Sequence, residues 1–316
     1  MVSQPIECTA AGKVILCGEH SVVYGQPAIA VPVSGLRAHA RIKPTPKESR
    51  LSLIASDLGE SIQISKAPVA HPLAAIARLT LSHCQAPEPG AELRVWSDLP
   101  IAAGLGSGAA ISVAIARALS TYLGYNLPSD QISALAYEVE KIHHGTPSGI
   151  DNTVIAWEQP VAFTKGEPPE VFTIGDAFHL LIANSGIHST TRDMVTGVRQ
   201  RWETNPERYN TYFKQMGNLA LEARKAIEQG NVKALGPLLN QNHARLVDIG
   251  VSHPKLDQLV TQAREAGASG AKLTGAGGGG NIIALVPFEN VDTVTHALQQ
   301  AGAVQIWHTL VSQEER

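Results

Sequence analysis

Three glycines, at positions 104, 106 and 108, lie close together in Pro100–Ala110, which reads Pro-Ile-Ala-Ala-Gly-Leu-Gly-Ser-Gly-Ala-Ala. A strand-like apolar stretch precedes this segment, and an alanine-rich helical pattern follows it. Glycines at such a junction let several backbone N–H groups converge on one anion, and the start of the next helix adds its unpaired amides. Phosphate is the natural ligand of that arrangement. A glycine-rich turn before a close-packed helix is the alternative for the segment taken alone.

Two further segments carry residues suited to phosphate chemistry. Lys272–Gly280 is a second glycine cluster, and a hinge would not explain its Lys-Leu-Thr-Gly lead-in. Lys13–Gly25 places a lysine in an apolar run and Glu19 and His20 in the following turn, for which a solvated turn is the alternative. Pro100–Ala110 is neither a Walker A loop, which needs Gly-Lys-Ser/Thr, nor a dinucleotide-binding GxGxxG in a parallel strand–helix–strand unit. The sequence therefore predicts a different phosphate-binding architecture.

The elements that must position these residues change in type along the chain. Apolar runs and alternating patterns predict strands at 13–17, 28–33, 36–42, 49–54, 61–64 and 93–96. Helical spacing predicts helices at 73–84 and 109–123, and a third that starts at Ser129 and buries Ile132, Leu135, Val139 and Ile142. Later in the chain we expect strands at 178–183, 282–286 and 304–311, mostly helix over 190–266, and a helix at 291–301. This order predicts an α+β fold with domains 1–178 and 179–316, and leaves open that the last strand returns to the first domain.

Composition narrows the class of protein. The chain has 316 residues, of which 44% are hydrophobic and 17% charged, enough for two buried cores. A net charge of −3 without long charged runs argues against nucleic-acid or anionic-membrane partners. The three cysteines, Cys8, Cys17 and Cys84, form no CxxC pair, and their low odd number fits a reducing cytosol. No signal-like apolar core is present, so a cytoplasmic protein is expected.

The three segments, in this order, resemble the three motifs of the GHMP kinases, a family named after galactose, homoserine, mevalonate and phosphomevalonate kinases. The resemblance runs from Lys13 to Gly280. It implies a ribosomal-S5-like N-terminal domain with the phosphate loop, a ferredoxin-like C-terminal domain, and an active site in the cleft. Lys13–Ala30 and Gly145–Asn152 resemble the branch of the family that phosphorylates mevalonate, since Ser21-Val22 follow Glu-His where galactokinases carry an aspartate. The resemblance thus implies phosphorylation of the C5 hydroxyl of mevalonate from Mg-ATP, on the route to isoprenoids.

The family pattern assigns the chemistry to a few residues. Asp151, which follows a Pro-Ser-Gly turn at an expected helix start, is the predicted base for the acceptor hydroxyl; an N-terminal helix cap is the alternative from local sequence. Lys13, predicted to lie beside Asp151, would lower the pKa of that hydroxyl. The predicted ATP-binding residues are Pro100, Ala103, Gly104, Leu105, Gly106, Ser107, Gly108, Ala109 and Ala110.

Magnesium is the predicted cofactor, with Glu140 and Ser107 as ligands. Mg²⁺ prefers one or two protein oxygens together with phosphate oxygens and water. Glu140 borders the apolar face at Val139, and its separation from Asp151 matches the family; a solvated helix glutamate is the alternative. One departure affects this prediction, because the family usually has a second, metal-binding serine where this chain has Gly108.

The predicted substrate contacts come from three segments. Glu19 and His20 are expected to contact the carboxylate or the hydroxyls of mevalonate, together with Gly277 of the last glycine cluster. Thr191 is the chosen helper from the segment 184–199, where Thr190 and Arg192 remain alternatives. A phosphomevalonate kinase, a mevalonate-diphosphate decarboxylase and a non-catalytic ligand sensor remain as rival functions, and a homodimer remains open.

Overall fold

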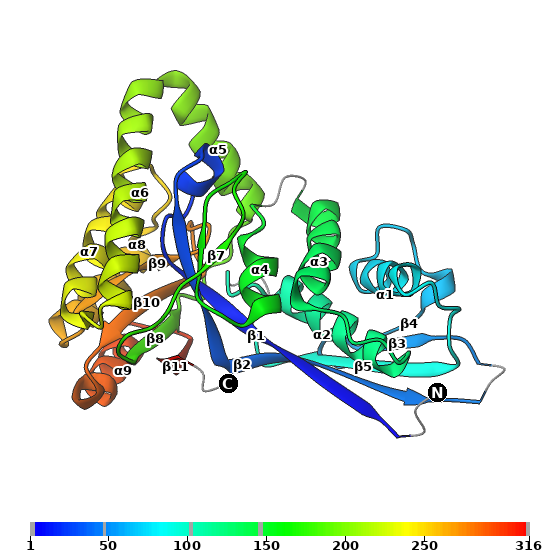
Figure 1. The fold of residues 1–316 in the computed structure, drawn as a ribbon. Coiled ribbons are helices and arrows are strands. Elements are labelled where there is room, and N and C mark those ends of the chain that lie inside the picture. Colours follow the sequence, from blue (N-terminus) through cyan, green and yellow to red (C-terminus); the bar gives the residue numbers. More distant parts are fainter. Residues whose placement is uncertain (1–3, 47–48, 101–103, 145–147, 314–316) are drawn as a thin grey trace. The chain divides into compact units, whose positions relative to one another are not determined.

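The computed structural model describes residues 4–46, 49–100, 104–144 and 148–313 (Figure 1). The chain forms two compact units, each assembled from separate segments. The first contains Met1–Gly12, Leu36–Ile101 and Gly106–Glu158, and the second contains Lys13–Gly35, Ala102–Leu105 and Gln159–Arg316. Because these units interleave along the sequence, the division at residues 178 and 179 stays a prediction.

Two long strands, β1 (Ile6–Cys17) and β2 (Ala28–Pro44), each contribute residues to both units. In the first unit, the later part of β2 pairs antiparallel with β5 (Ala91–Ser97), which pairs in parallel with β3 (Ser52–Ala55), and β3 pairs antiparallel with β4 (Glu60–Gln63). The prediction of separate strands at 28–33 and 36–42 is wrong. The two runs are joined into one strand, since each end of β2 has its own antiparallel partner.

In the described part of the first unit, the α-helices are α1 (Pro72–His83), α2 (Ser107–Tyr122), α3 (Ser129–His144) and α4 (Ile150–Trp157). Helix α2 packs against α1, α3 and α4. The predicted start of α3 is confirmed, and Ile132, Leu135 and Val139 are buried. Ile142 is 44% exposed, so its predicted burial is wrong; it lies in the last turn of the helix.

The second unit contains an antiparallel sheet in the order β11-β8-β10-β9. Its strands are β8 (Phe178–Asn184), β9 (Gly270–Thr274), β10 (Asn281–Val286) and β11 (Gln305–Val311). Strand β11 pairs with β8 in this sheet, and so does not return to the first domain. The short strands β6 (Val161–Phe163) and β7 (Glu170–Val171) extend the first part of β2 within this unit.

Among the residues of the second unit that the structure describes, the α-helices are α5 (Thr191–Thr204), α6 (Pro206–Glu228), α7 (Val232–Asp248), α8 (Pro254–Glu265) and α9 (Val291–Gln300). The starts of α5 to α8 coincide with side-chain caps from Thr190, Asn205, Asn231 and His253. Apolar residues of these helices and of β8, β9 and β10 form one buried cluster that includes Leu181, Phe213, Leu246, Leu259, Leu273 and Ala284. The side-chain caps thus define where these helices begin, and the buried cluster holds them against the sheet of the second unit.

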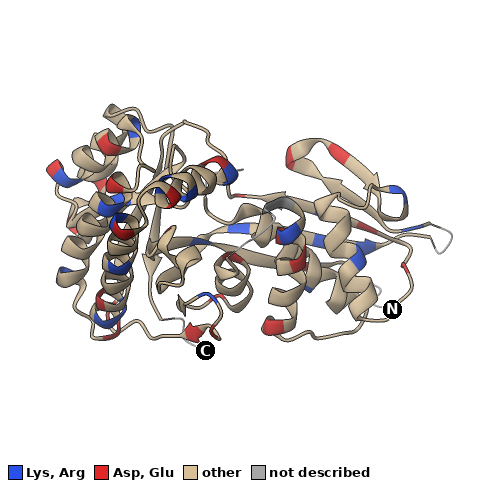
Figure 2. Cartoon of the chain, turned by 90° about the horizontal axis from the view of Figure 1, so that it is seen from above, with Lys and Arg blue, Asp and Glu red and all other residues tan. Residues whose placement is uncertain are grey.

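Charged residues of both signs alternate along the helices of the second unit (Figure 2). Surface pairs such as Arg199–Glu203 and Arg224–Glu228 follow helical spacing. None of the helices in the described ranges is both long enough and apolar enough to cross a membrane.

Candidate active site

Lys13 lies against the first glycine-rich segment. Its side chain is only 2% exposed, and its ammonium donates to the carbonyl oxygen of Gly104 over 3.1 Å. Its backbone N–H donates to the carbonyl of Leu105 over 3.0 Å. One buried residue of β1 therefore holds two successive carbonyls of the predicted phosphate loop.

The last glycine cluster meets the same loop. A Cβ placed on Gly104, whose φ is +80°, would lie 3.5 Å from the carbonyl oxygen of Thr274 and 3.6 Å from the Cα of Gly275. The Thr274 hydroxyl donates to the carbonyl of Ile15 and accepts from its N–H, at 3.0 and 3.3 Å. The second unit thus brings together residues from all three sequence motifs. The Lys-Leu-Thr lead-in forms strand β9, which sequence periodicity missed because the strand is buried throughout.

His20 has a defined tautomer in this geometry. Its Nε2 lies 2.8 Å from the carbonyl oxygen of Ala276, which can only accept, so Nε2 carries the hydrogen. Burial lowers the pKa of His20 to about 4, so the ring is neutral near pH 7 and Nδ1 is an acceptor. The backbone of His20 has φ +61°, a region that favours glycine. An acceptor at Nδ1 suits a hydroxyl donor, and does not suit a carboxylate.

Glu19 is buried, with 1% of its surface exposed. One carboxylate oxygen forms an ion pair with the ammonium of Lys272, and the other accepts from the side-chain amide of Asn242 over 3.0 Å. Both oxygens therefore have protein partners. The expected contact of Glu19 with substrate stays a prediction, and neither Lys272 nor Asn242 was assigned a role from the sequence.

The other predicted substrate residues lie around the start of α5. Thr191 is exposed as the first residue of that helix, and the hydroxyl of Thr190 caps it by accepting from the N–H of Asp193 over 3.1 Å. Ser189 donates to the carbonyl of Gly277 over 2.5 Å. Gly277 has φ +81°, and a Cβ there would lie 2.1 Å from a backbone oxygen, so only glycine fits. The segment before α5 and the last glycine cluster are therefore adjacent.

The first unit carries the helix that follows the phosphate loop. Gly106, with φ +75°, precedes α2, whose first residue is Ser107. Ala109 and Ala110 are buried, so only their backbone groups could reach a phosphate. Pro100 ends the preceding segment, while Ala103 falls outside the described residues.

Glu140 faces the start of α2. A Cβ placed on Gly108 would lie 3.5 Å from Oε1 of Glu140. Glu140 is half-buried, whereas Glu138 is exposed and pairs with Lys141 over 2.6 Å. The two glutamates therefore differ in burial, and the role of Glu140 as a metal ligand stays a prediction. A single carboxylate beside a helix N-terminus that offers Ser107 is a donor set that fits Mg²⁺ bound to phosphates.

Asp151 lies in the first turn of α4, after Gly149 with φ +91°. The predicted helix start is confirmed. The next residue, Asn152, is 5% exposed and donates to the hydroxyl of Ser133 on α3 over 2.8 Å. This bond ties the helix of Asp151 to the helix that carries Glu140.

A second tie lies at the other end of α4, and no sequence pattern predicted it. Arg117 of α2 donates to the carbonyl of Ala156 over 2.8 Å and pairs with Glu158 over 2.5 Å. Arg37 pairs with the same carboxylate over 2.8 Å. Helices α2 and α4 are therefore joined by charge-assisted hydrogen bonds, which fixes Asp151 relative to the start of α2 within this unit.

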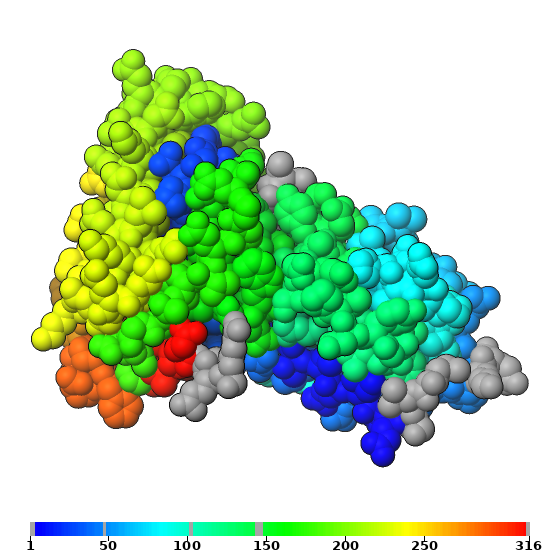
Figure 3. Space-filling view, in the orientation of Figure 1, coloured from blue at the N-terminus to red at the C-terminus, as the bar shows by residue number. Residues whose placement is uncertain are grey.

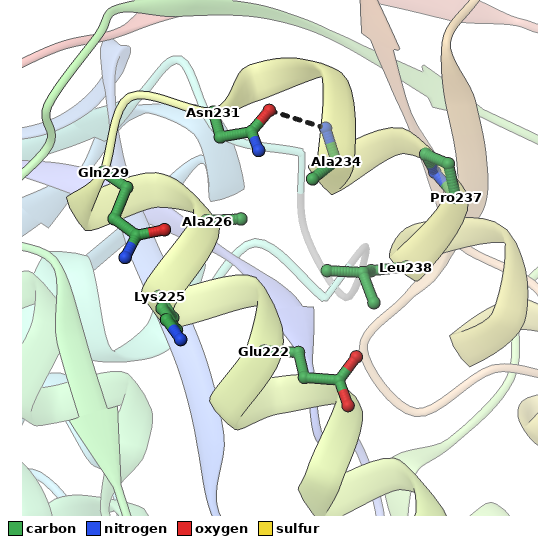
Figure 4. A pocket seen from close by; sticks show the side chains of 8 residues that line it. All are labelled: Glu222, Lys225, Ala226, Gln229, Asn231, Ala234, Pro237 and Leu238. Atoms are coloured by element: carbon green, nitrogen blue, oxygen red, sulfur yellow. Dashed lines mark hydrogen bonds between the residues drawn. The ribbon is translucent and has the colours of Figure 1, made fainter.

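A groove between α6 and α7 contains none of the predicted site residues (Figure 4). It is lined by Glu222, Lys225, Ala226, Gln229, Asn231, Ala234, Pro237 and Leu238. The region of these two helices is yellow-green and yellow at the left of Figure 3. Asn231 is used as the cap of α7, since its side chain accepts from the N–H of Ala234 over 3.3 Å. The groove is therefore a surface feature of helix packing.

Comparison with known proteins agrees with this geometry. Residues 71–159 match the GHMP kinases N terminal domain, and residues 223–304 match the GHMP kinases C terminal domain. The mevalonate kinase of Thermococcus sibiricus is 34% identical over 94% of each chain, and that of Pyrococcus horikoshii is 35% identical over 97% of this chain and 95% of its own.

Solved structures give the same result. The mevalonate kinase of L. major in complex with R-mevalonate has a TM-score of 0.87 and 26% identity, with both chains fully covered. That of Methanococcus jannaschii has a TM-score of 0.85 and 27% identity, with 99% of each chain covered. The chain therefore belongs to the GHMP kinases and has their two-domain fold. Both of these curated relatives are mevalonate kinases that the chain matches over more than nine-tenths of its length, so within that family it groups with the ATP-dependent kinases of mevalonate.

Proposed function

We propose that the protein transfers the γ-phosphoryl group of ATP to the C5 hydroxyl of mevalonate, giving 5-phosphomevalonate and ADP for isoprenoid synthesis. The observation that carries this proposal is the convergence of the three motif segments at Lys13, Gly104 and Thr274, in a chain similar to mevalonate kinases along its whole length. In the reaction, the hydroxyl oxygen bonds to phosphorus, the bond to the departing ADP oxygen breaks, and the hydroxyl proton passes to Asp151.

The protein groups supply position and charge, which are the main requirements of phosphoryl transfer. Backbone amides at Gly106–Ala110 bind phosphate oxygens at the start of α2, where the helix dipole favours negative charge. Lys13 adds a cation against the same loop. Asp151, in the first turn of α4, accepts the hydroxyl proton. His20 accepts a hydrogen bond from a substrate hydroxyl at Nδ1.

Magnesium would be held by Glu140 and the hydroxyl of Ser107. The half-buried carboxylate of Glu140 faces the first turn of α2, so the residues fit an ion bound to nucleotide phosphates. When bound, the ion neutralises charge on the phosphates. Mg²⁺ commonly keeps several waters, so the glycine at position 108 does not prevent binding. The cytosolic location and a homodimer stay predictions.

The test is ADP release with a panel of acceptors: mevalonate, phosphomevalonate, mevalonate diphosphate and galactose. Of the four acceptors, only mevalonate is expected to give rapid ADP release. Faster turnover of phosphomevalonate or of galactose would replace the proposed substrate. A folded protein that binds ATP and phosphorylates none of the four would favour the non-catalytic sensor.

A further inference from the structure

Lys272 is the most deeply buried charged residue in the part of the chain that the structure describes, with 0% of its surface exposed. Its ammonium pairs with Glu19 and lies 3.4 Å from the carbonyl oxygen of Ile15. Asn242, also 0% exposed, donates to the second oxygen of Glu19. Removing two charges from water is costly, and here it is offset by a direct ion pair and by hydrogen bonds to both carboxylate oxygens. Because all three side chains are buried and both charged groups are paired, the triad is not a surface contact.

Helix α7 holds the strand that carries Lys272. Strand β9 pairs with β10 on one side only, so the N–H groups on its other edge need partners. Asn240 accepts from the N–H of Ala271 over 3.0 Å, and Nδ1 of His243 accepts from that of Leu273 over 3.3 Å. A Cβ on Gly236 of the helix would lie 2.3 Å from the backbone oxygen of Ser269, so helix and strand are in close contact. Hydrogen bonds to the backbone of β9 therefore hold Lys272 in place, in addition to its ion pair with Glu19.

The triad connects this strand to a strained turn. Glu19 directly precedes His20, whose backbone φ of +61° is unfavourable for a residue with a side chain. Two residues beyond the strand, Ala276 accepts the hydrogen bond of the His20 ring. The ion pair joins Glu19 to β9, and the ring bond joins His20 to the following glycine segment. These two ties, four residues apart on the second segment, define the direction of the His20 ring.

We propose that Lys272 and Asn242 are positioning residues for substrate binding, and that Glu19 acts through them to orient His20 without contacting the substrate itself. This inference rests on the proposed function and deepens it. It also gives a reason for the lysine at the start of the last glycine motif, which a phosphate-binding loop alone does not explain. Loss of the Glu19–Lys272 pair should mainly weaken binding of the substrate whose hydroxyl donates a hydrogen bond to His20. Binding of ATP should change little, because the ATP-binding segment at Gly104 is held separately by Lys13.

A double-mutant cycle on Glu19→Gln and Lys272→Met tests the proposal. Each single variant should raise the KM for mevalonate about tenfold, with less than about a twofold change in the KM for ATP. The double variant should be no worse than either single variant, giving a coupling of about fivefold or more, as expected for contacting residues. If Glu19 touches the substrate directly, Glu19→Gln will raise KM by the same factor in both backgrounds, and the proposal fails. Lys233→Met, an exposed lysine on α7, is the matched control and should leave both KM values unchanged.

Asn242→Ala provides a milder test should Lys272→Met not fold. It removes one hydrogen bond to Glu19 and leaves the ion pair. The KM for mevalonate should therefore rise about threefold at constant kcat, because that change corresponds to the loss of one hydrogen bond. A lowered melting temperature with an unchanged KM would make the triad purely structural and overturn the proposal. Failure of the proposed function itself is distinguishable, because the unmodified protein would then not turn over mevalonate.

Discussion

The carboxylate of Glu140 faces Gly108, with Oε1 only 3.5 Å from where a Cβ at residue 108 would lie. That separation is ordinary van der Waals contact, and Gly108 does not have a positive φ. A side chain at position 108 would therefore enter the space beside Glu140 without forcing the backbone. The relationship connects the predicted metal ligand to the position where this chain has a glycine in place of the family's usual serine.

Gly108→Ser should strengthen magnesium binding. The added hydroxyl would supply a second oxygen beside Glu140, so the Mg²⁺ concentration for half-maximal rate should fall about three- to tenfold, with little change in kcat. A Mg²⁺ titration of the rate, with thermal melting in parallel, measures this. Ser107→Ala is the companion variant and should shift the requirement the other way. An unchanged melting temperature with an unchanged Mg²⁺ requirement would show that residue 108 does not face the metal.

Asp151→Asn should nearly abolish catalysis while leaving nucleotide binding intact. Amide replaces the proton acceptor in an almost unchanged shape, so kcat should fall by about 10² to 10⁴. The dissociation constant for ATP should change less than about twofold. Asp130→Asn, an exposed acid in the first turn of α3, is the control for loss of a helix-start charge. Retention of near-normal kcat would remove Asp151 from the mechanism.

His20→Ala should raise the KM for mevalonate more than the KM for ATP. Nδ1 is an acceptor because Nε2–H is committed to Ala276, so the lost interaction is with a substrate hydroxyl. An effect of about tenfold is expected for a buried hydrogen bond. Because the C5 hydroxyl is the proposed phosphoryl acceptor, the analogue to test lacks the other hydroxyl of mevalonate, at C3, and the substitution should leave the KM of that analogue unchanged. A full effect on that analogue would mean that His20 contacts another part of the substrate.

Sequence patterns predicted the elements set by local interactions and missed the contacts set by tertiary packing. Helical spacing and caps correctly located α2, α3 and the start of α4, because local interactions decide those features. The same patterns missed β9, whose residues are all buried and so show no alternation. The ties between Arg117 and Glu158 and between Glu19 and Lys272 join residues 41 and 253 positions apart. Such partners depend on tertiary packing, which no single window of sequence reports.

The free energy of unfolding should depend on pH through two buried histidines. Burial, with a smaller contribution from the nearby Arg201, lowers the pKa of His20 to about 4. Burial and the nearby Arg264 likewise lower the pKa of His243, whereas the carboxylate of Asp257 acts to raise it. The unfolded chain takes up protons near pH 6.5, whereas the folded rings resist protonation until about pH 4. Stability is therefore full above about pH 6.5 and falls as pH decreases toward 4.

Urea unfolding between pH 5 and 7.5 measures this dependence. Each histidine should contribute up to about 1.4 kcal/mol per pH unit in the sloping region. His243→Gln should remove part of the slope, whereas the exposed control His296→Gln should not. If the free energy of unfolding depends on pH with the same slope in all three proteins, the fold does not favour the neutral form of His243.

Acceptor choice tests the central claim most directly. With saturating Mg-ATP, we predict that kcat/KM for mevalonate exceeds that for phosphomevalonate by at least about 100-fold, equivalent to roughly 2.7 kcal/mol of transition-state discrimination. The product should carry its phosphate on the C5 oxygen, with one ADP released for each phosphate transferred. A higher kcat/KM for phosphomevalonate, or ADP release without phosphorylation of mevalonate, would contradict the account.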